Sequence, residues 1–353
     1  MKVAIIGLGF MGVMHARIYQ ALPGVELGAV VDIDPAGAQK KLRSLNMDRP
    51  VYASLDDLLA NLEVQVIDIC SPTGQHVDLA TQAAAAGKHV FIEKPLAFDL
   101  PGCEAIQSAV AKAGVHAQVG HCIRFWPEYV ELRRVVQSDE LGALKSLSLV
   151  RRAARPGGGN PLHWVNQAAL SGGAALDLHV HDTDYVLHLL GTPKSVYSRT
   201  TQGMSGDDHI FTCYQYDTTV VVAEGGWDYP EHYGFCMAFE AIFAKGCLAY
   251  DINAAAPLRL TREGEPSVTV SVQQPGPPAS GSKAGNISAL GGYYNELQYF
   301  IACLQQNNAP QIATLAQASE SIRVLRAELE SAQTGQPCQL LPYPYLKPTE
   351  ITL

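Results

Sequence analysis

The first 120 residues alternate between short apolar runs and helical stretches, and this alternation is the strongest constraint on the fold. The apolar runs are rich in β-branched residues and occupy 3–6, 27–31, 64–70, 90–93 and 115–119. Helical stretches lie between them, at 11–22, 75–86 and 102–113. A repeated strand–helix–strand order predicts a parallel sheet covered by helices on both faces. The near-continuous apolarity of the strands agrees, because a strand buried on both faces need not alternate.

The pattern changes after residue 122. Strand-like segments follow at 144–152, 195–202, 209–216, 219–227, 234–243, 247–251, 257–261 and 267–272. Helices are predicted at 127–136, 174–190, 293–305 and 315–331. Several strands alternate polar and apolar residues, as over 212–216, which indicates an antiparallel or mixed sheet with one solvated or partner-covered face. A Pro-, Gly- and Ser-rich loop is expected at 273–286, and an extended tail after residue 335.

A glycine-rich turn follows the first strand and opens the first helix. Its sequence is Gly7-Leu8-Gly9-Phe10-Met11-Gly12. The first glycine permits a tight turn, the second lets the backbone approach a pyrophosphate, and the third lets helix and strand pack closely. Asp32 ends the second strand, where its carboxylate can accept from both ribose hydroxyls and repel a 2′-phosphate. The sequence therefore predicts a dinucleotide site that favours NAD over NADP.

Two further strand ends carry polar residues. Ser71 and Thr73 follow the strand that ends at Cys70, and the carboxyl ends of strands line the cofactor crevice in such sheets. Both are candidates to contact ribose or phosphate. His76 is a candidate too, although a plain first-turn helix role fits it equally well.

Glu93 and Lys94 form a charged pair at the end of a buried strand that Pro95 terminates. A partly desolvated lysine there can hydrogen-bond a substrate hydroxyl and stabilise an alkoxide. Glu93 can orient the ammonium, and both residues lie on the cofactor side of the crevice. The alternative is a surface lysine followed by a proline.

The helix over 174–190 carries the second polar cluster. Asp177, His181, Asp184 and His188 share one face of a regular α-helix. His181 with Asp177 one turn earlier suits acid–base chemistry near neutral pH. A metal site is the rival interpretation, but no cysteine cluster or HExxH spacing accompanies these residues, so no metal is predicted.

Composition narrows the classes of protein. A chain of 353 residues favours two domains, here assigned to 1–122 and 123–353. The net charge of −9 argues against nucleic acid or an anionic membrane as partner. The apolar runs are too short to span a membrane or to form a signal peptide, so a cytoplasmic protein is expected. The eight cysteines show no CxxC spacing, which fits reduced, buried thiols.

These motifs together resemble the glucose–fructose oxidoreductase / inositol dehydrogenase / MocA (Gfo/Idh/MocA) family. The quoted residues are the glycine turn, Asp32, Ala86-Gly87-Lys88-His89-Val90 leading into Glu93-Lys94-Pro95, and Gly172-Gly173 with Asp177, His181 and Asp184. The resemblance implies an α/β protein: an N-terminal Rossmann domain plus a C-terminal α/β domain with a large, mostly antiparallel open sheet. It implies that this sheet packs against another subunit, as in a homodimer or homotetramer.

The same resemblance implies roles for individual residues. Lys94 is the catalytic lysine, and Asp177 and His181 complete the site. His121 and Arg124 lie in the segment that leaves the Rossmann domain and approaches nicotinamide and substrate. This chain departs from the family where Ala174 stands third in the glycine run, and where His179 occupies a position often held by glycine.

The leading interpretation is an NAD-dependent dehydrogenase that oxidises a ring hydroxyl of a sugar, sugar derivative or cyclitol. Arg124 and Trp164 are candidates to bind the substrate, the tryptophan by stacking on a ring face. A structural ion pair for Arg124 and a core position for Trp164 stay open. The alternatives are a redox-neutral, NAD-dependent glycosidase and a non-catalytic nucleotide sensor.

Overall fold

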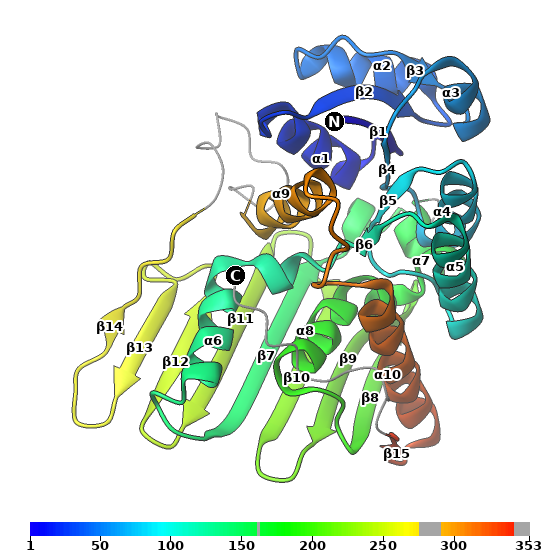
Figure 1. Cartoon of the computed structure of the whole chain (residues 1–353). Helices are drawn as coiled ribbons and strands as arrows, with labels where there is room; N and C mark the ends of the chain where they lie inside the picture. The colour runs from blue at the N-terminus through cyan, green and yellow to red at the C-terminus, as the bar shows by residue number, and fades with distance from the viewer. Residues whose placement is uncertain (161–162, 275–290, 342–353) are drawn as a thin grey trace. The chain divides into compact units, whose positions relative to one another are not determined.

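The computed structural model describes residues 1–160, 163–274 and 291–341, and these form two compact units (Figure 1). The first unit contains residues 1–122 and 291–319, and the second contains 123–274 and 320–341. The first segment of the first unit ends at residue 122. The two continuous segments 1–122 and 123–353 need a correction, however, because 291–319 pack into the first unit.

The first unit is built on a six-stranded parallel sheet with the order β3-β2-β1-β4-β5-β6. Its strands are β1 (Lys2–Ile6), β2 (Glu26–Val31), β3 (Val51–Tyr52), β4 (Val66–Ile69), β5 (His89–Ile92) and β6 (Ala117–Val119). Its helices are α1 (Phe10–Ala21), α2 (Pro35–Ser44), α3 (Leu55–Asn61), α4 (His76–Ala85), α5 (Leu100–Ala113) and α9 (Gly291–Gln305). The strand order reverses between β1 and β4, and a crevice beyond the carboxyl ends of such strands is where this fold binds ligands.

Helix α9 belongs to the first unit because its apolar face completes the core around α1. Leu297, Phe300 and Ile301 are buried in one cluster with residues of β1 and α1, and the ring of Phe300 lies 5.6 Å from that of Phe91. Burial of apolar area at roughly 25 cal/mol per Å² makes this a strong attachment. The amphipathic pattern predicted the helix, but not which core it joins.

The second unit contains a nine-stranded sheet with the order β14-β13-β12-β11-β7-β10-β9-β8-β15. Its strands are β7 (Leu144–Ala154), β8 (Ser195–Gly203), β9 (Gly206–Gln215), β10 (Val220–Tyr229), β11 (Phe235–Phe243), β12 (Gly246–Asp251), β13 (Leu258–Arg262), β14 (Val268–Thr269) and β15 (Cys338–Gln339). Only β7 and β10 pair in parallel; the other neighbours are antiparallel. The predicted fold class, α/β with a Rossmann domain and a mostly antiparallel open sheet, is confirmed.

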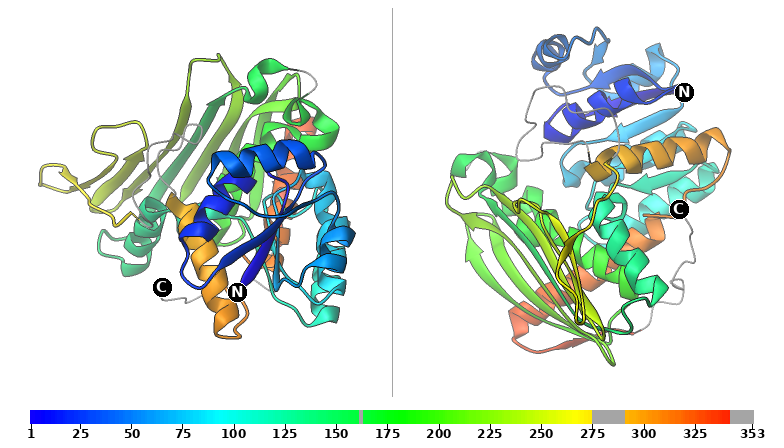
Figure 2. Two further views of the ribbon diagram at one scale, coloured as in Figure 1. Left: turned by 90° about the horizontal axis from the view of Figure 1, so that it is seen from above. Right: turned by 90° about the vertical axis from the view of Figure 1, so that its left-hand side faces the viewer.

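Helices cover one face of this sheet: α6 (Pro127–Ser138), α8 (Val180–Leu190) and α10 (Leu315–Thr334) (Figures 1 and 2). Residues on the opposite face alternate with buried ones along each strand. Large apolar side chains there are between 40% and 61% exposed: Tyr197, Phe211, Val220, Val222 and Ile242. Exposed apolar area of this kind marks a surface suited to a partner.

The predicted helix over 174–190 is not one regular helix. It begins with a π-helical segment, Ala175–His179, and continues as α8 from Val180. Single π-helical turns inside α-helices occur often at functional sites.

Two predicted segments fall outside the described residues: most of the loop at 273–286, and the tail beyond 341. Among the helices that the structure describes, none combines the length and apolarity needed to cross a membrane.

Candidate active site

The glycine-rich turn between β1 and α1 has the geometry of a dinucleotide cradle. Gly7 has φ +89°, and a Cβ at this position would lie 2.9 Å from the carbonyl oxygen of Cys70. A Cβ on Gly12 would lie 2.0 Å from the carbonyl oxygen of Gly7, whereas one on Gly9 would meet nothing within 4 Å. Gly7 and Gly12 are therefore required because a side chain there would clash with the backbone. Gly9, by contrast, leaves open space at the end of α1.

That helix end also suits an anion. Gly9 is the N-cap of α1 and provides no side-chain hydrogen bond to the first turn. Uncapped amides at the positive end of a helix dipole attract phosphate groups. Phe10, the first helical residue, is exposed, and Met11 is half-buried. The residues present thus fit the pyrophosphate of a dinucleotide.

Asp32, directly after β2, is held by two backbone amides. Its Oδ2 accepts a hydrogen bond of 2.8 Å from the amide of Leu8, and its Oδ1 accepts one of 2.9 Å from Asp34. These bonds fix the carboxylate beside the glycine turn. Sequence reasoning missed Lys41, whose Nζ donates to the carbonyl oxygen of Leu8 at 2.8 Å. No motif spacing predicts this position for Lys41, because its side chain reaches the glycine turn only when α2 packs beside that turn.

The segment after β4 carries Ser71 and Thr73. Thr73 is buried, and Ser71 is half-buried with its Oγ enclosed. Within the described parts of the chain, the Ser71 Oγ has no hydrogen-bond partner. A buried hydroxyl without a partner is costly, so this atom fits a site that a polar ligand completes.

His76 is buried, and both of its ring nitrogens lie 2.9 Å from backbone carbonyl oxygens, Nδ1 from that of Pro95 and Nε2 from that of Ser71. Burial lowers the pKa of the imidazole, although these carbonyls act against that effect. His76 therefore ties the end of β4 to the segment after β5. This geometry favours the structural role that the sequence left open over a direct cofactor contact.

Glu93 and Lys94 follow the last residue of β5. The Glu93 Oε2 accepts a hydrogen bond from the backbone amide of Lys94 at 3.1 Å, and its Oε1 lies 3.2 Å from Nε2 of His15. Lys94 is half-buried. Glu93 thus has its carboxylate beside an interior histidine that sequence reasoning did not identify. His121, also buried, follows Gly120, where a Cβ would lie 3.2 Å from the Glu93 carboxyl group.

In the second unit, Asp177 lies in the π-helical segment and His181 in the first turn of α8. Asp177 is half-buried and His181 is 9% exposed. The π-helical turn changes the angular offset expected for residues four apart in a regular helix. Lys94 belongs to the first unit and these two residues to the second, so a single site containing all three stays a prediction.

The Gly172-Gly173 pair positions this segment. Both glycines have positive φ, +73° and +75°. A Cβ on Gly173 would lie 2.9 Å from the carbonyl oxygens of Ser205 and Asp207, so the chain passes too close to the β8–β9 turn for another residue. Ala174, the departure from a third glycine, is buried without a positive φ.

Arg124 and Asp184 form a buried, bidentate ion pair. The guanidinium Nε and Nη2 each donate to the carboxylate at 2.7 Å, and Ser321 Oγ adds a bond of 2.8 Å to Asp184. Their side chains are 2% and 0% exposed. This geometry favours the structural ion pair over substrate binding by Arg124.

Two further buried pairs anchor the same helical stretch and were not predicted. Arg151 of β7 binds Asp182 through two bonds of 2.9 Å. His179 Nε2 lies 3.0 Å from Glu328 of α10. A Cβ on Gly225 would lie 2.9 Å from His179, so the glycine in β10 makes room for the imidazole that departs from the family pattern. Charged residues on 174–190 thus serve the packing of this segment.

Trp164 lies in a 3₁₀ turn, Trp164–Asn166, and is half-buried. It packs beside Val165, Ala174 and Trp227, and its ring stacks on that of His163 at 6.4 Å. This environment accommodates both interpretations, a core position and a ring-stacking surface.

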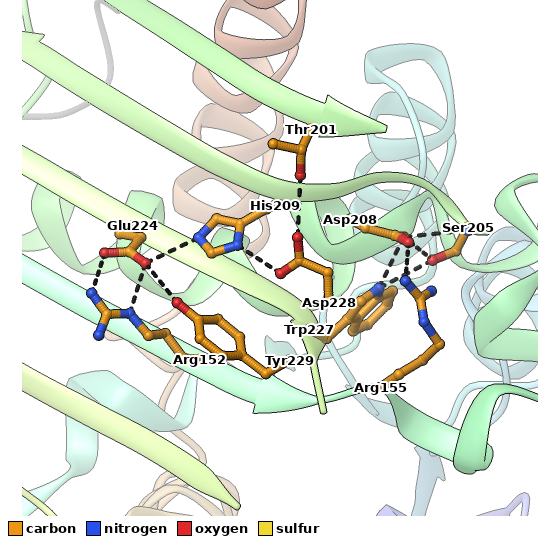
Figure 3. Close-up of polar contacts among 10 residues, drawn as sticks. All are labelled: Arg152, Arg155, Thr201, Ser205, Asp208, His209, Glu224, Trp227, Asp228 and Tyr229. Atoms are coloured by element: carbon orange, nitrogen blue, oxygen red, sulfur yellow. Dashed lines mark hydrogen bonds and ion pairs between the residues drawn. The ribbon is translucent and has the colours of Figure 1, made fainter. Parts of the chain in front are cut away.

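Figure 3 shows two polar clusters on the second sheet that the sequence did not reveal. Asp208 binds Arg155, Ser205 and the Trp227 Nε1. Because Arg155 precedes the segment leading to Trp164, this cluster fixes the start of that segment. In the other cluster, His209 lies between Asp228 at 2.8 Å and Glu224 at 3.0 Å, and Arg152 binds Glu224.

Comparison with known proteins places both units in one family. Residues 1–121 match the model described as "Oxidoreductase family, NAD-binding Rossmann fold", and residues 129–249 match the GFO/IDH/MocA C-terminal domain. The chain belongs to the Gfo/Idh/MocA family of oxidoreductases.

Individual relatives agree with this membership. Scyllo-inositol 2-dehydrogenase (NAD(+)) of Bacillus subtilis is 28% identical over 96% of both chains. Myo-inositol 2-dehydrogenase of Thermotoga maritima is 27% identical over 74% of this chain and 79% of its own. The uncharacterized oxidoreductase YrbE of Bacillus subtilis is 31% identical, but the match spans only 53% of each chain.

Among solved structures, levoglucosan dehydrogenase in complex with NADH and levoglucosan has a TM-score of 0.81 at 19% identity. The match covers 96% of this chain and 99% of that one. At this identity, the likeness establishes the shared fold. The family membership shows that the chain is an oxidoreductase and that NAD is the cofactor of its Rossmann domain.

Proposed function

We propose that this chain oxidises a ring hydroxyl of a sugar, sugar derivative or cyclitol with NAD as hydride acceptor. The observation that carries the proposal is the arrangement within the first unit. The glycine turn after β1, Ser71 after β4 and Lys94 after β5 all follow the carboxyl ends of neighbouring parallel strands. A nucleotide cradle and a lysine on one sheet edge suit alcohol oxidation.

The likeness to scyllo-inositol 2-dehydrogenase (NAD(+)), which extends over 96% of both chains, supports the substrate class. Cyclitols and pyranoses both present a ring carbinol flanked by other hydroxyl groups. Such substrates need several hydrogen-bonding side chains, and Lys94, His121, Asp177 and His181 supply amine, imidazole and carboxylate groups. Arg124 contributes to this proposal only indirectly, by holding Asp184 and thus α8.

Bound NAD supplies the acceptor for the hydride that leaves the carbinol carbon. In the proposed mechanism, the Lys94 ammonium donates a hydrogen bond to the substrate oxygen and stabilises negative charge that develops on it. His181 takes the hydroxyl proton as general base, and Asp177 orients the substrate hydroxyl and the lysine. Trp164 is proposed to face the apolar side of the ring.

The second unit is further proposed to form a homodimer or homotetramer through the exposed sheet face. The exposed apolar side chains on that face support this assembly: Tyr197, Phe211, Val220, Val222 and Ile242. The acidic chain is proposed to take a small carbohydrate or cyclitol as partner, and neither nucleic acid nor a membrane.

A panel of cyclitols, pyranoses and sugar acids incubated with protein and NAD tests the activity. The expected result is growth of the reduced-nicotinamide absorbance with at least one cyclitol or pyranose, and growth at least ~100-fold slower with the Lys94→Met control. A panel on which no carbohydrate or cyclitol reduces NAD, while simple aliphatic alcohols do, would contradict the proposed substrate class.

A further inference from the structure

A cluster of ionisable side chains lies inside the first unit and reaches the backbone amide of Lys94 through Glu93. His15 comes from α1, Asp68 from β4, Glu93 from the segment after β5, and Glu296 from α9. His15, Asp68 and Glu296 are 0% exposed, and Glu93 is 5% exposed. Buried charged groups cost free energy unless they are paired, so the cluster requires a charge balance of its own.

His15 joins two of the carboxylates. Its Nδ1 lies 2.8 Å from Asp68 Oδ2, and its Nε2 lies 3.2 Å from Glu93 Oε1. Burial by itself lowers the pKa of His15, but the charges of Asp68 and Cys70 and their hydrogen bonds outweigh it and hold the pKa well above its usual value. A doubly protonated imidazole therefore donates a hydrogen bond to Asp68 and forms an ion pair with Glu93.

Glu296 has a different environment. One nitrogen or oxygen atom from each of His15, Glu93 and Glu296 lies within 4.8 Å of the others. Both carboxyl oxygens of Glu296 are buried, and neither has a hydrogen-bond partner among the residues described. Burial, followed by the charges of Glu93 and Asp68, raises the pKa of Glu296 well above its usual value, while His15 acts in the opposite direction.

The charge balance then follows. Two carboxylates and one imidazolium leave one net negative charge, and an ionised Glu296 would add a second inside the same apolar core. The titratable groups packed around this carboxyl come from three elements and their ends: His15, Tyr19, Asp68, Cys70 and Glu93. A proton on Glu296 is the smallest change that limits the buried charge.

We propose that Glu296 is a neutral acid which, together with His15, holds the Glu93 carboxylate in place, so that His15 and Glu296 are positioning residues for Lys94. The connection is short, because Glu93 Oε2 accepts the backbone amide of Lys94 at 3.1 Å. Gly120 also lies against the Glu93 carboxyl group, because a Cβ at Gly120 would be 3.2 Å from it. This inference rests on the proposed role of Lys94.

The protonation state is tested by thermal unfolding, which needs no substrate. The folded chain keeps the Glu296 proton at pH values where the unfolded chain has lost it. Wild-type stability therefore falls as pH rises from the ordinary glutamate pKa, about 4.3, toward the raised folded value. Glu296→Gln mimics the neutral acid and removes this loss. Its Tm should equal that of wild type near pH 4.5 and exceed it by on the order of 3 °C at pH 8.

Glu320→Gln is the matched control. Glu320 is equally buried, but Arg323 donates two hydrogen bonds of 2.7 Å to its carboxylate. This variant loses an ion pair, so its Tm should fall at pH 7. A fall of similar size for Glu296→Gln at pH 7 would show that Glu296 is ionised and would overturn the proposal. The proposal would also be overturned if chelation of divalent metal lowered the Tm of wild type but left the Tm of Glu296→Gln unchanged.

Positioning is tested by kinetics with Glu296→Ala, which removes the carboxyl group that lies near the Glu93 carboxylate. We expect kcat to fall at least 10-fold while the KM for NAD stays within 2-fold. Glu296→Gln should retain most of the kcat that alanine loses. Wild-type kcat in Glu296→Ala, alongside an inactive Lys94→Met, would overturn the positioning role and leave the proposed function intact. An active Lys94→Met would instead refute the proposed role of the lysine, and the Tm comparison would still decide the protonation state.

Discussion

Asp32 shows how a single side chain sets cofactor preference. Two backbone amides, of Leu8 and Asp34, fix its carboxylate beside the glycine turn. A fixed negative charge there accepts hydrogen bonds from ribose hydroxyls and repels a 2′-phosphate. Lys41 does not cancel this effect in the structure, because its ammonium donates to the carbonyl oxygen of Leu8.

Asp32→Ser should weaken NAD binding and reduce discrimination against NADP. Serine keeps a hydrogen-bonding group but removes the repelling charge, so we expect the ratio of NADP to NAD dissociation constants to fall at least 10-fold. Fluorescence titration with both reduced cofactors measures this ratio. A wild-type chain that prefers NADP, or an unchanged ratio in the variant, would contradict the role assigned to Asp32.

Lys94→Met should lower turnover at least ~100-fold, the usual effect of losing a positioned acid–base group. Methionine keeps the unbranched stem and removes the ammonium. NAD affinity should stay within about 3-fold, because the glycine turn and Asp32 hold the nucleotide. Cofactor titration combined with steady-state rates checks both expectations, and near-normal turnover in the variant would remove Lys94 from the mechanism.

Sequence reasoning identified residues whose role depends on local geometry. Gly7 and Gly12 sit in one short motif, and Asp32 follows the next strand, where backbone amides hold its carboxylate. It did less well where the partner is distant in sequence. Arg124 meets Asp184 60 residues later, and that pairing exists only after the second unit has folded.

At the scale of elements, periodicity predicted most strands and helices but not their irregularities. At the π-helical start of 174–190, Gly173 lies close to the β8–β9 turn and Gly225 of β10 makes room for His179. Neither contact has a periodic signal. The same limit applies to α9, whose amphipathic pattern fits either unit equally well.

The Arg151–Asp182 pair is predicted to hold α8 on the sheet. Both side chains are almost fully buried, so Asp182→Ala removes the carboxylate that accepts two guanidinium hydrogen bonds and should cost about 3 kcal/mol of stability. The double variant Arg151→Met/Asp182→Leu removes both charges and should recover most of that loss. Chemical denaturation of the three proteins measures the effect. Equal stability of wild type and Asp182→Ala would show that the pair does not anchor the helix.

At the scale of the whole molecule, the open face of the nine-stranded sheet is predicted to bind a second copy of the chain. Light scattering at micromolar concentration should give at least twice the 37.9 kDa chain mass. Phe211→Asp places a charge on the exposed apolar surface and should shift the particle toward one chain mass, whereas Asp48→Asn, a change at an exposed residue of the first unit, should not. A wild-type particle of single-chain mass would contradict the assembly.

The central claim is net oxidation of a carbohydrate or cyclitol, and the fate of the hydride tests it most directly. A dehydrogenase releases reduced cofactor at each turnover, whereas a redox-neutral glycosidase returns the hydride to the sugar, and a sensor transfers none. Protein, excess NAD and a panel of cyclitols, free pyranoses and aryl glycosides are followed by reduced-nicotinamide absorbance and by aglycone release. The account predicts that reduced cofactor accumulates well beyond one equivalent per active site with a cyclitol or free pyranose. Aglycone release with no more than one equivalent of reduced cofactor would contradict it.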